Sequence, residues 1–125
     1  MSPRSEEFMD QARERAAVAP DLLLAGHLEI AVSAAYYAML YAARAALSED
    51  EESARTHRGT WNAFRLRYVI TDAFDAALFT LAQHAQAARE GGDYEAVTPS
   101  REEAARYVDG AAEFLAGVER MLDAR

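Results

Sequence analysis

The sequence predicts an all-α fold: an up-and-down four-helix bundle with one additional short helix, in a single domain over residues 1–125. Three observations support it: an apolar stretch of helix length, apolar residues at spacings of three and four elsewhere, and the lack of an alternating strand pattern. The apolar stretch spans residues 29–47, and from Ile30 to Leu47 only Arg44 is charged. A helix that is apolar on all sides must be surrounded, so we expect this one at the centre of the bundle.

A membrane span is the alternative interpretation of this central stretch, because its length approaches the roughly 20 residues that cross a bilayer. However, alanine is only weakly hydrophobic, and Tyr36, Tyr37 and Tyr41 place three hydroxyls near the middle. Arg44 lies one turn from the end, and a second apolar run of this length is absent. We therefore interpret the stretch as a buried helix of a soluble protein and expect no membrane association.

The helix that precedes the central one carries start and stop signals. Ser2 can accept the first free backbone N–H groups, and Pro3 suits the first helical position. Pro20 removes a backbone donor and should kink or break this helix. Gly26 should end it, since glycine adopts the left-handed C-terminal conformation without strain. Because the central helix follows almost at once, the two helices should pack antiparallel.

An acidic run, SEDEES at residues 48–53, follows the central helix. It has no apolar residue to anchor it, so we expect a mobile, solvated loop. Six flexible residues offer no preset geometry for a metal ion. The sequence therefore predicts neither a metal site nor a cofactor.

The segment after the acidic run is basic and contains the additional short helix, expected over residues 59–70. Trp61, Phe64 and Tyr68 then fall on one face and should enter the core. The basic side chains could simply be solvated, or they could form a cationic patch for a phosphate-bearing ligand or an acidic partner. The candidate patch is Arg55, His57, Arg58, Arg65 and Arg67.

The two remaining long helices are defined by their apolar stripes. Thr71 or Asp72 should cap the fourth helix, and Gly91 and Gly92 should stop it. The fifth should begin at residues 98–99 or at Ser100, where a glutamate three residues on completes a capping box. The expected buried residues are Phe74, Leu78, Leu81, Ala85 and Ala88 in the fourth helix and Ala104, Val108, Ala111, Leu115, Val118 and Leu122 in the fifth.

Composition excludes several functional classes. A formal net charge of −8 argues against a general nucleic-acid binder, which needs clustered cations. The chain has no cysteine, so disulfides and thiolate chemistry are excluded. The three histidines lack the spacing of di-iron or helical zinc sites. The N-terminal residues are charged throughout, unlike a signal peptide, so we expect a cytoplasmic protein.

Three sequence elements resemble the HEPN domain, in particular its small stand-alone prokaryotic branch. The first is the run GHLEIAVSAAYYAMLYAARAAL from Gly26 to Leu47, which contains Ala-Tyr-Tyr-Ala. The second is Thr-His-Arg-Gly at residues 56–59, similar to a Ser-His-Lys-Gly element of that branch. The third is Arg89-x-x-x-Asp93-Tyr94, similar to Arg-x-x-Ala-Asp-Tyr. Together with the alanine-rich last helix, they cover most of the chain.

The resemblance implies an all-helical bundle, commonly a homodimer, and in many members a partner nucleotidyltransferase encoded alongside in a toxin–antitoxin-like pair. Many HEPN proteins are metal-independent ribonucleases, with an arginine followed after four to six residues by a histidine. Arg89 matches this arginine, but residues 90–96 contain no histidine, so the general acid–base group is missing. We therefore expect a non-catalytic binding or interaction module. The alternatives are a divergent ribonuclease that uses Arg89 with His57 or Tyr94, and a nucleotide-binding regulator. The ligand expected in these cases is a nucleotide or RNA.

The polar residues of the matching elements allow two interpretations. They could form a charge and hydrogen-bond cluster that fixes the fourth helix against the central one, because a buried guanidinium needs a carboxylate. Alternatively, they could face a cleft and bind a nucleotide phosphate. The residues concerned are Tyr36, Tyr37, Arg44, Arg89, Asp93 and Tyr94.

Overall fold

The fold is an all-α bundle, which confirms the predicted class. The computed structural model describes the backbone of residues 1–95 and 98–125, and the side chains of residues 1–91 and 98–125. The side chains of Asp93 and Tyr94, two of the predicted site residues, thus lie outside the described residues. The helices are α1 (Pro3–Leu24), α2 (Leu28–Glu49), α3 (His57–Phe64), the π-helical segment η1 (Arg65–Val69), α4 (Ala76–Glu95) and α5 (Arg101–Asp123).

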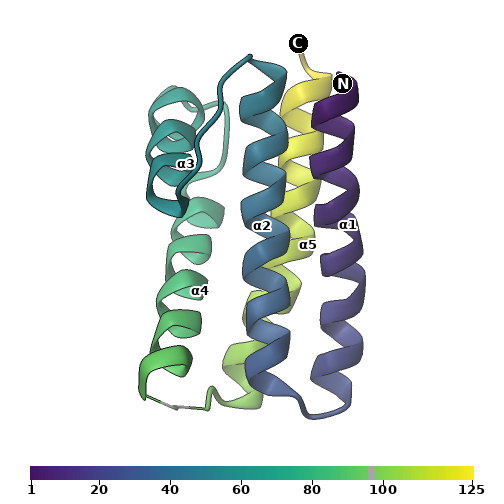
Figure 1. Ribbon diagram of the computed structural model, residues 1–125, viewed down its shortest axis with the longest axis vertical. Helices are drawn as coiled ribbons and strands as arrows, with labels where there is room; N and C mark the ends of the chain where they lie inside the picture. Colours follow the sequence, from purple (N-terminus) through teal and green to yellow (C-terminus); the bar gives the residue numbers. More distant parts are fainter. Residues whose placement is uncertain (96–97) are drawn as a thin grey trace.

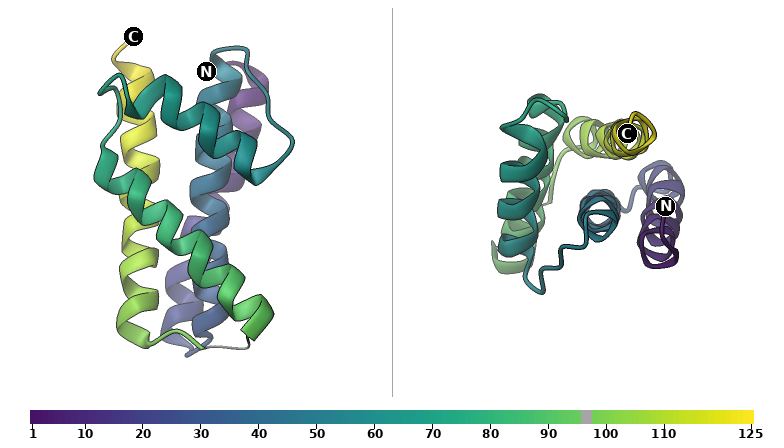
Figure 2. Two further views of the ribbon diagram at one scale, coloured as in Figure 1. Left: turned by 90° about the vertical axis from the view of Figure 1, so that its left-hand side faces the viewer. Right: turned by 90° about the horizontal axis from the view of Figure 1, so that it is seen from above.

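The long helices α1, α2, α4 and α5 alternate in direction along the bundle, as predicted (Figure 1). Helices α1, α2 and α5 run side by side, whereas α3 and α4 form a second layer that crosses α2 and α5 at a tilt (Figure 2). Both chain ends lie at the same end of the bundle as the last turn of α2. Helix α2 contacts α1, α3, α4 and α5, so it is the central helix.

Helix α2 is buried along most of its length because its neighbours pack against it from several sides. Met39 and Leu40 have no exposed surface, whereas Ile30 near its start is 56% exposed. Small alanine side chains let neighbouring helices approach closely. The helix passes a length and composition test for a membrane span, but 67% of its apolar window is buried inside the bundle, as in the core helix of a soluble protein. The buried residues are Ala31, Val32, Ala35, Tyr36, Ala38, Met39, Leu40, Ala42, Ala43, Ala45, Ala46 and Leu47.

Helix α1 has the predicted ends but not the predicted interruption. The Ser2 hydroxyl accepts the backbone N–H of Ser5 at 3.2 Å. Gly26 has φ +85°, and its N–H and that of His27 donate to the carbonyls of Leu23 and Leu22, a Schellman motif. The break expected at Pro20 is wrong, since α1 continues to Leu24. Pro20 lies on the exposed face, so the carbonyl it leaves unpaired can be hydrated while packing against α2 holds the helix.

The short helical segment has the predicted buried face but begins two residues earlier than expected. Trp61, Phe64 and Tyr68 are at most 3% exposed. Helix α3 starts at His57 because the Thr56 hydroxyl accepts the N–H of Gly59 at 2.9 Å. A Cβ at position 59 would lie 2.9 Å from that hydroxyl oxygen, so glycine permits this cap.

The predicted ends of α4 are wrong. Asp72 has φ +62° and lies in the preceding turn. Asp75 caps the helix instead, with its carboxylate accepting the N–H of Ala77 at 2.8 Å. The helix also passes through Gly91 and ends at Glu95, because glycine costs only about 1 kcal/mol in a helix and does not forbid it. In contrast, Ser100 caps α5 as predicted, accepting the N–H of Glu103 at 3.0 Å.

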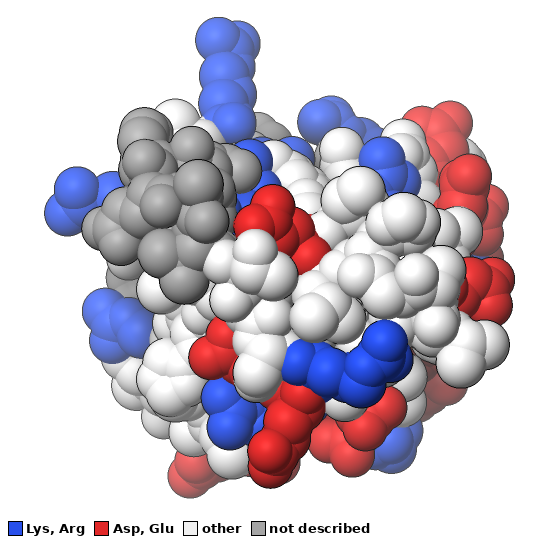
Figure 3. All heavy atoms as spheres, turned by 90° about the horizontal axis from the view of Figure 1, so that it is seen from below, with Lys and Arg blue, Asp and Glu red and all other residues white. Residues whose placement is uncertain are grey.

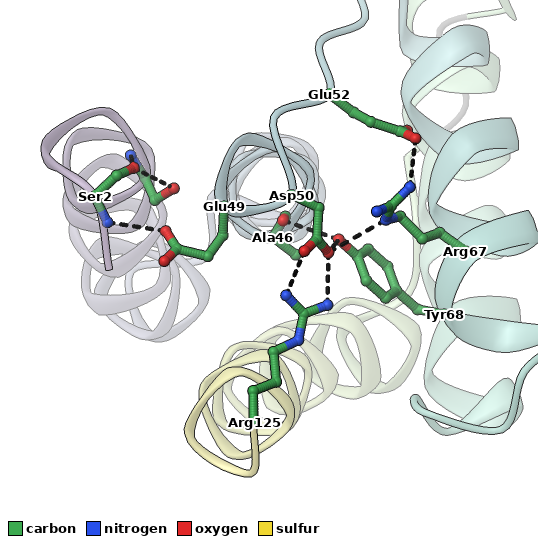
Figure 4. Close-up of polar contacts among 9 residues, drawn as sticks. Ser2, Ala46, Glu49, Asp50, Glu52, Arg67, Tyr68 and Arg125 are labelled. Atoms are coloured by element: carbon green, nitrogen blue, oxygen red, sulfur yellow. Dashed lines mark hydrogen bonds and ion pairs between the residues drawn. The ribbon is translucent and has the colours of Figure 1, made fainter.

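Three residues of the acidic run at residues 48–53 form a network of contacts, which corrects the prediction of a wholly solvated loop, whereas Glu51 and Ser53 are exposed. Its first two residues belong to α2, and Glu49 accepts the backbone N–H of Ser2 at 2.9 Å. Asp50 accepts both guanidinium nitrogens of Arg125 at 2.5 Å and the Tyr68 hydroxyl at 2.5 Å (Figure 4). The run therefore connects α1, α2, η1 and Arg125, the second residue after α5, at one end of the bundle.

Arg67 belongs to the same network, which removes it from the predicted cationic patch. Its guanidinium lies 3.3 Å from Asp50 and 2.6 Å from Glu52. The positive charge of Arg67 is therefore neutralised by the acidic run before it. Arg58 and Arg65 remain exposed on the outer face of α3 and η1.

Candidate functional site

A cluster of aromatic and cationic side chains forms where α2, α3 and α4 meet. Tyr36 and Tyr37 come from α2, His57 from the first turn of α3, and Arg89 from α4. The His57 ring lies 5.7 Å from each tyrosine ring, and the Arg89 guanidinium lies 4.9 Å above the Tyr37 ring. The fold thus brings His57 beside Arg89, although 32 positions separate them in the sequence. We call Tyr36, Tyr37, His57 and Arg89 the His57 cluster.

A chain of two hydrogen bonds fixes the imidazole of His57. The indole N–H of Trp61, which can only donate, lies 3.1 Å from the Tyr36 hydroxyl oxygen. That hydroxyl lies 3.0 Å from Nδ1 of His57. Tyr36 is fully buried, and among the described residues Nδ1 is the available acceptor for its hydrogen. The hydroxyl therefore accepts from Trp61 and donates to Nδ1.

This arrangement determines the tautomer of the neutral imidazole. Because Nδ1 accepts the Tyr36 hydrogen, the ring proton must reside on Nε2. Burial lowers the pKa of His57 below its usual 6.5, and the charges of Arg44 and Arg89 lower it further against a small opposing effect of Glu90. Burial likewise raises the pKa of Tyr36 above 10. At neutral pH the cluster therefore presents an Nε2–H donor on an uncharged ring.

Replacement of Tyr36 by phenylalanine tests the direction of the Tyr36–His57 hydrogen bond and the tautomer that it implies. We expect the wild-type 15N spectrum to show a protonated Nε2 and a bare Nδ1 on His57, with a titration midpoint below pH 6.5. Tyr36→Phe removes the donor to Nδ1, so both tautomers should be populated. His84, which is exposed on α4, provides an internal reference that should not change. A wild-type His57 with its proton on Nδ1 would contradict the proposed direction of the hydrogen bonds.

Among the described side chains, Arg44 has neutral partners; the carboxylate of Asp93, the partner that the sequence suggests, lies outside them. Its Nε lies 3.4 Å from the Thr60 hydroxyl, and one terminal nitrogen lies 3.4 Å from the carbonyl of Arg55. Its guanidinium also lies 5.9 Å from the Tyr41 ring. Arg44 is half-buried, so neutral acceptors and the remaining water suffice to solvate its charge.

The predicted site residues are therefore only partly brought together. Tyr36, Tyr37 and Arg89 share one cluster. The positive charge of Arg44 acts on it by lowering the pKa of His57. Asp93 and Tyr94 lie outside the described side chains. Trp61 was expected only in the core, and its role as donor to Tyr36 depends on a contact across 25 residues that has no sequence signal. Over the described part of the chain, no group of three or more acidic or histidine side chains could hold a metal ion.

Comparisons of the sequence with known proteins place the chain in a family. The HEPN domain model matches residues 5–121. A protein of Methanocaldococcus jannaschii, named as a candidate toxin, is 27% identical over 103 residues, which cover 82% of this chain and 70% of that protein. A UPF0332 protein of Gloeobacter violaceus is 30% identical over 125 residues, which cover 93% of this chain and 99% of that protein. The resemblance seen in the sequence is thereby confirmed, and the chain belongs to the HEPN domain family.

Proposed function

We propose that the chain is a non-catalytic binding module of a toxin–antitoxin-like pair, and that the His57 cluster binds a phosphate of a nucleotide or RNA. The family and the relative named as a candidate toxin support a toxin–antitoxin-like role. The phosphate is supported by the donors that gather at the cluster. They are the Nε2–H of His57 and the guanidinium of Arg89, with Arg44 adding positive charge nearby.

The observation that favours binding over catalysis is the hydrogen bond from Tyr36 to His57 Nδ1. A general base needs a free lone pair near the substrate, but the one on Nδ1 is occupied and Nε2 carries its proton. A general acid needs an imidazolium, which burial and the two arginines disfavour. A neutral Nε2–H donor beside an arginine suits phosphate recognition without proton transfer.

Binding of fluorescently labelled single-stranded RNA and of ATP tests the proposal. We expect His57→Ala and Arg89→Gln to weaken binding about tenfold or more, because each removes a hydrogen bond to a charged group. Arg58→Gln is the matched control, since Arg58 is exposed beside His57 and should change affinity only slightly. Equal affinity in all four proteins would reject the cluster as the binding site.

A ribonuclease is the second candidate, because the fold places a histidine beside Arg89 that the local sequence lacks. Cleavage of defined RNAs by wild type and by Arg89→Ala separates the two functions. We expect no Arg89-dependent product. A cut that disappears in Arg89→Ala and in His57→Ala would replace the binding proposal with the enzymatic one.

The proposed partners follow from the family and require their own measurement. We propose a homodimer that associates with a nucleotidyltransferase-fold protein. Light scattering of the isolated chain and of the chain co-expressed with a nucleotidyltransferase encoded beside it measures both associations. A monomer that does not co-purify with that protein would reject this part of the proposal while leaving the ligand site intact.

A further inference from the structure

A second cationic site lies at the end of the bundle that carries both termini. A cavity of about 230 Å³, open to solvent, is lined by the first turns of α1, the last turns of α2 and the loop that leads to α3. Three guanidinium-bearing residues line it, namely Arg4, Arg44 and Arg55, together with Phe8 and Leu47. Its volume exceeds that of a single water site many times, yet it is smaller than the usual pocket for a drug-sized ligand.

No described carboxylate forms a direct ion pair with an arginine of this cavity. Among the described residues, neither Arg4, Arg44 nor Arg55 has a carboxylate within salt-bridge distance. Glu52 also lines the cavity, but its carboxylate is held by Arg67 at 2.6 Å. Three of the thirteen basic residues of a chain with net charge −8 thus meet at one cavity.

Basic side chains are more dispersed at the opposite end of the bundle, over the part of it that the structure describes. The opposite end of the bundle shows uncharged surface between scattered basic and acidic side chains (Figure 3). The three cavity arginines instead come from α1, from α2 and from the loop before α3, and they line the same cavity. Guanidinium groups, with their planar sets of donors, match the oxygens of phosphate groups.

We propose that this cavity binds the diphosphate group of a small molecule. Two or more negative charges would offset the repulsion among the three arginines, and a single small anion would leave part of that charge uncompensated. The Phe8 ring and Leu47 supply an apolar wall for the atoms that join the diphosphate. Arg44 also bonds to Thr60 and to the Arg55 carbonyl, so the ligand would contact both α2 and the loop that precedes His57.

Calorimetric titration with inorganic pyrophosphate, ADP and AMP tests this site. We expect pyrophosphate or ADP to bind at least tenfold more tightly than AMP. A preference for ADP would indicate a nucleotide source, and equal binding of pyrophosphate would indicate that the diphosphate alone is recognised. Arg4→Gln and Arg55→Gln should each weaken this binding about tenfold or more.

Two control variants show whether pyrophosphate binding depends on the cavity arginines themselves. Arg58→Gln makes the same charge change three residues after Arg55 but outside the cavity, so it should leave pyrophosphate affinity nearly unchanged. His57→Ala identifies any pyrophosphate bound at the His57 cluster: binding that is lost in His57→Ala but kept in Arg4→Gln and Arg55→Gln would also overturn the proposal. The proposal is overturned if pyrophosphate does not bind, or if Arg58→Gln weakens binding as much as Arg55→Gln does.

Discussion

Truncation of Phe64 to alanine is expected to lower the free energy of unfolding by about 3–5 kcal/mol, the usual cost of removing a buried phenylalanine. The Phe64 side chain has no exposed surface and lies at the centre of an aromatic core. Five aromatic rings surround it with centroids 5.0–6.4 Å away, from α3, η1, α5 and the segment around the start of α4. They belong to Trp61, Tyr68, Phe74, Phe79 and Phe114.

Leu66→Ala is the matched control, because Leu66 lies two residues further along and is 58% exposed. Urea unfolding should show a change within about 0.5 kcal/mol for this variant. A loss below about 1 kcal/mol in Phe64→Ala, well under the usual cost, would mean that the aromatic core does not hold α3 and η1 onto the bundle. Those segments carry His57 and Trp61, so the same variant should also disturb the His57 cluster.

Replacement of Asp50 by asparagine is expected to cost about 2 kcal/mol of stability at neutral pH. The Arg125 guanidinium, aided by the Tyr68 hydroxyl and by Arg67, lowers the pKa of the Asp50 carboxyl from 3.8 to about 2. This shift corresponds to about 2 kcal/mol of preferential interaction with the ionised form. Because the folded-state pKa is depressed, the stability is fully present above about pH 4 and is lost as the pH falls towards 2.

Unfolding measured at several pH values therefore identifies the contribution of Asp50. The wild type should lose stability between about pH 4 and pH 2 more steeply than Asp50→Asn, whose amide does not titrate. Asp109→Asn serves as control, because Asp109 is exposed on α5 and should behave as wild type. If the free energy of unfolding falls equally steeply below about pH 4 in wild type and Asp50→Asn, the network at this end of the bundle does not depend on the carboxylate charge.

Much of the fold could be predicted from the sequence because its determinants are local. The continuous apolar run identified α2, and the spacing of Trp61, Phe64 and Tyr68 identified a face that is buried in the structure. The caps at Ser2 and Ser100 depend on residues three positions away, so periodicity and capping chemistry suffice to find them. The Ala-Tyr-Tyr-Ala motif of the family lies in α2 and could be recognised from the sequence.

The errors occur where tertiary packing outweighs local preference. Pro20 and Gly91 disfavour helix locally, yet α1 and α4 continue through them. Packing of α1 against α2 offsets the cost of Pro20, and a glycine costs a helix only about 1 kcal/mol. Asp50 was assigned to a solvated loop since its partners Tyr68 and Arg125 lie 18 and 75 residues away. The sequence of one segment cannot show which residues, so far away along the chain, will lie beside it in the fold.

The sequence by itself determined that this chain is an α-helical bundle around a tyrosine-bearing apolar helix, because helix propensity and hydrophobic periodicity are properties of neighbouring residues. The tertiary structure alone decided that His57 lies beside Arg89. It also decided that Tyr36 and Trp61 set the proton position on His57 and that three arginines share a cavity. These contacts join separate helices, so they exist only once the helices have packed, and the chemistry of both candidate sites follows from that packing.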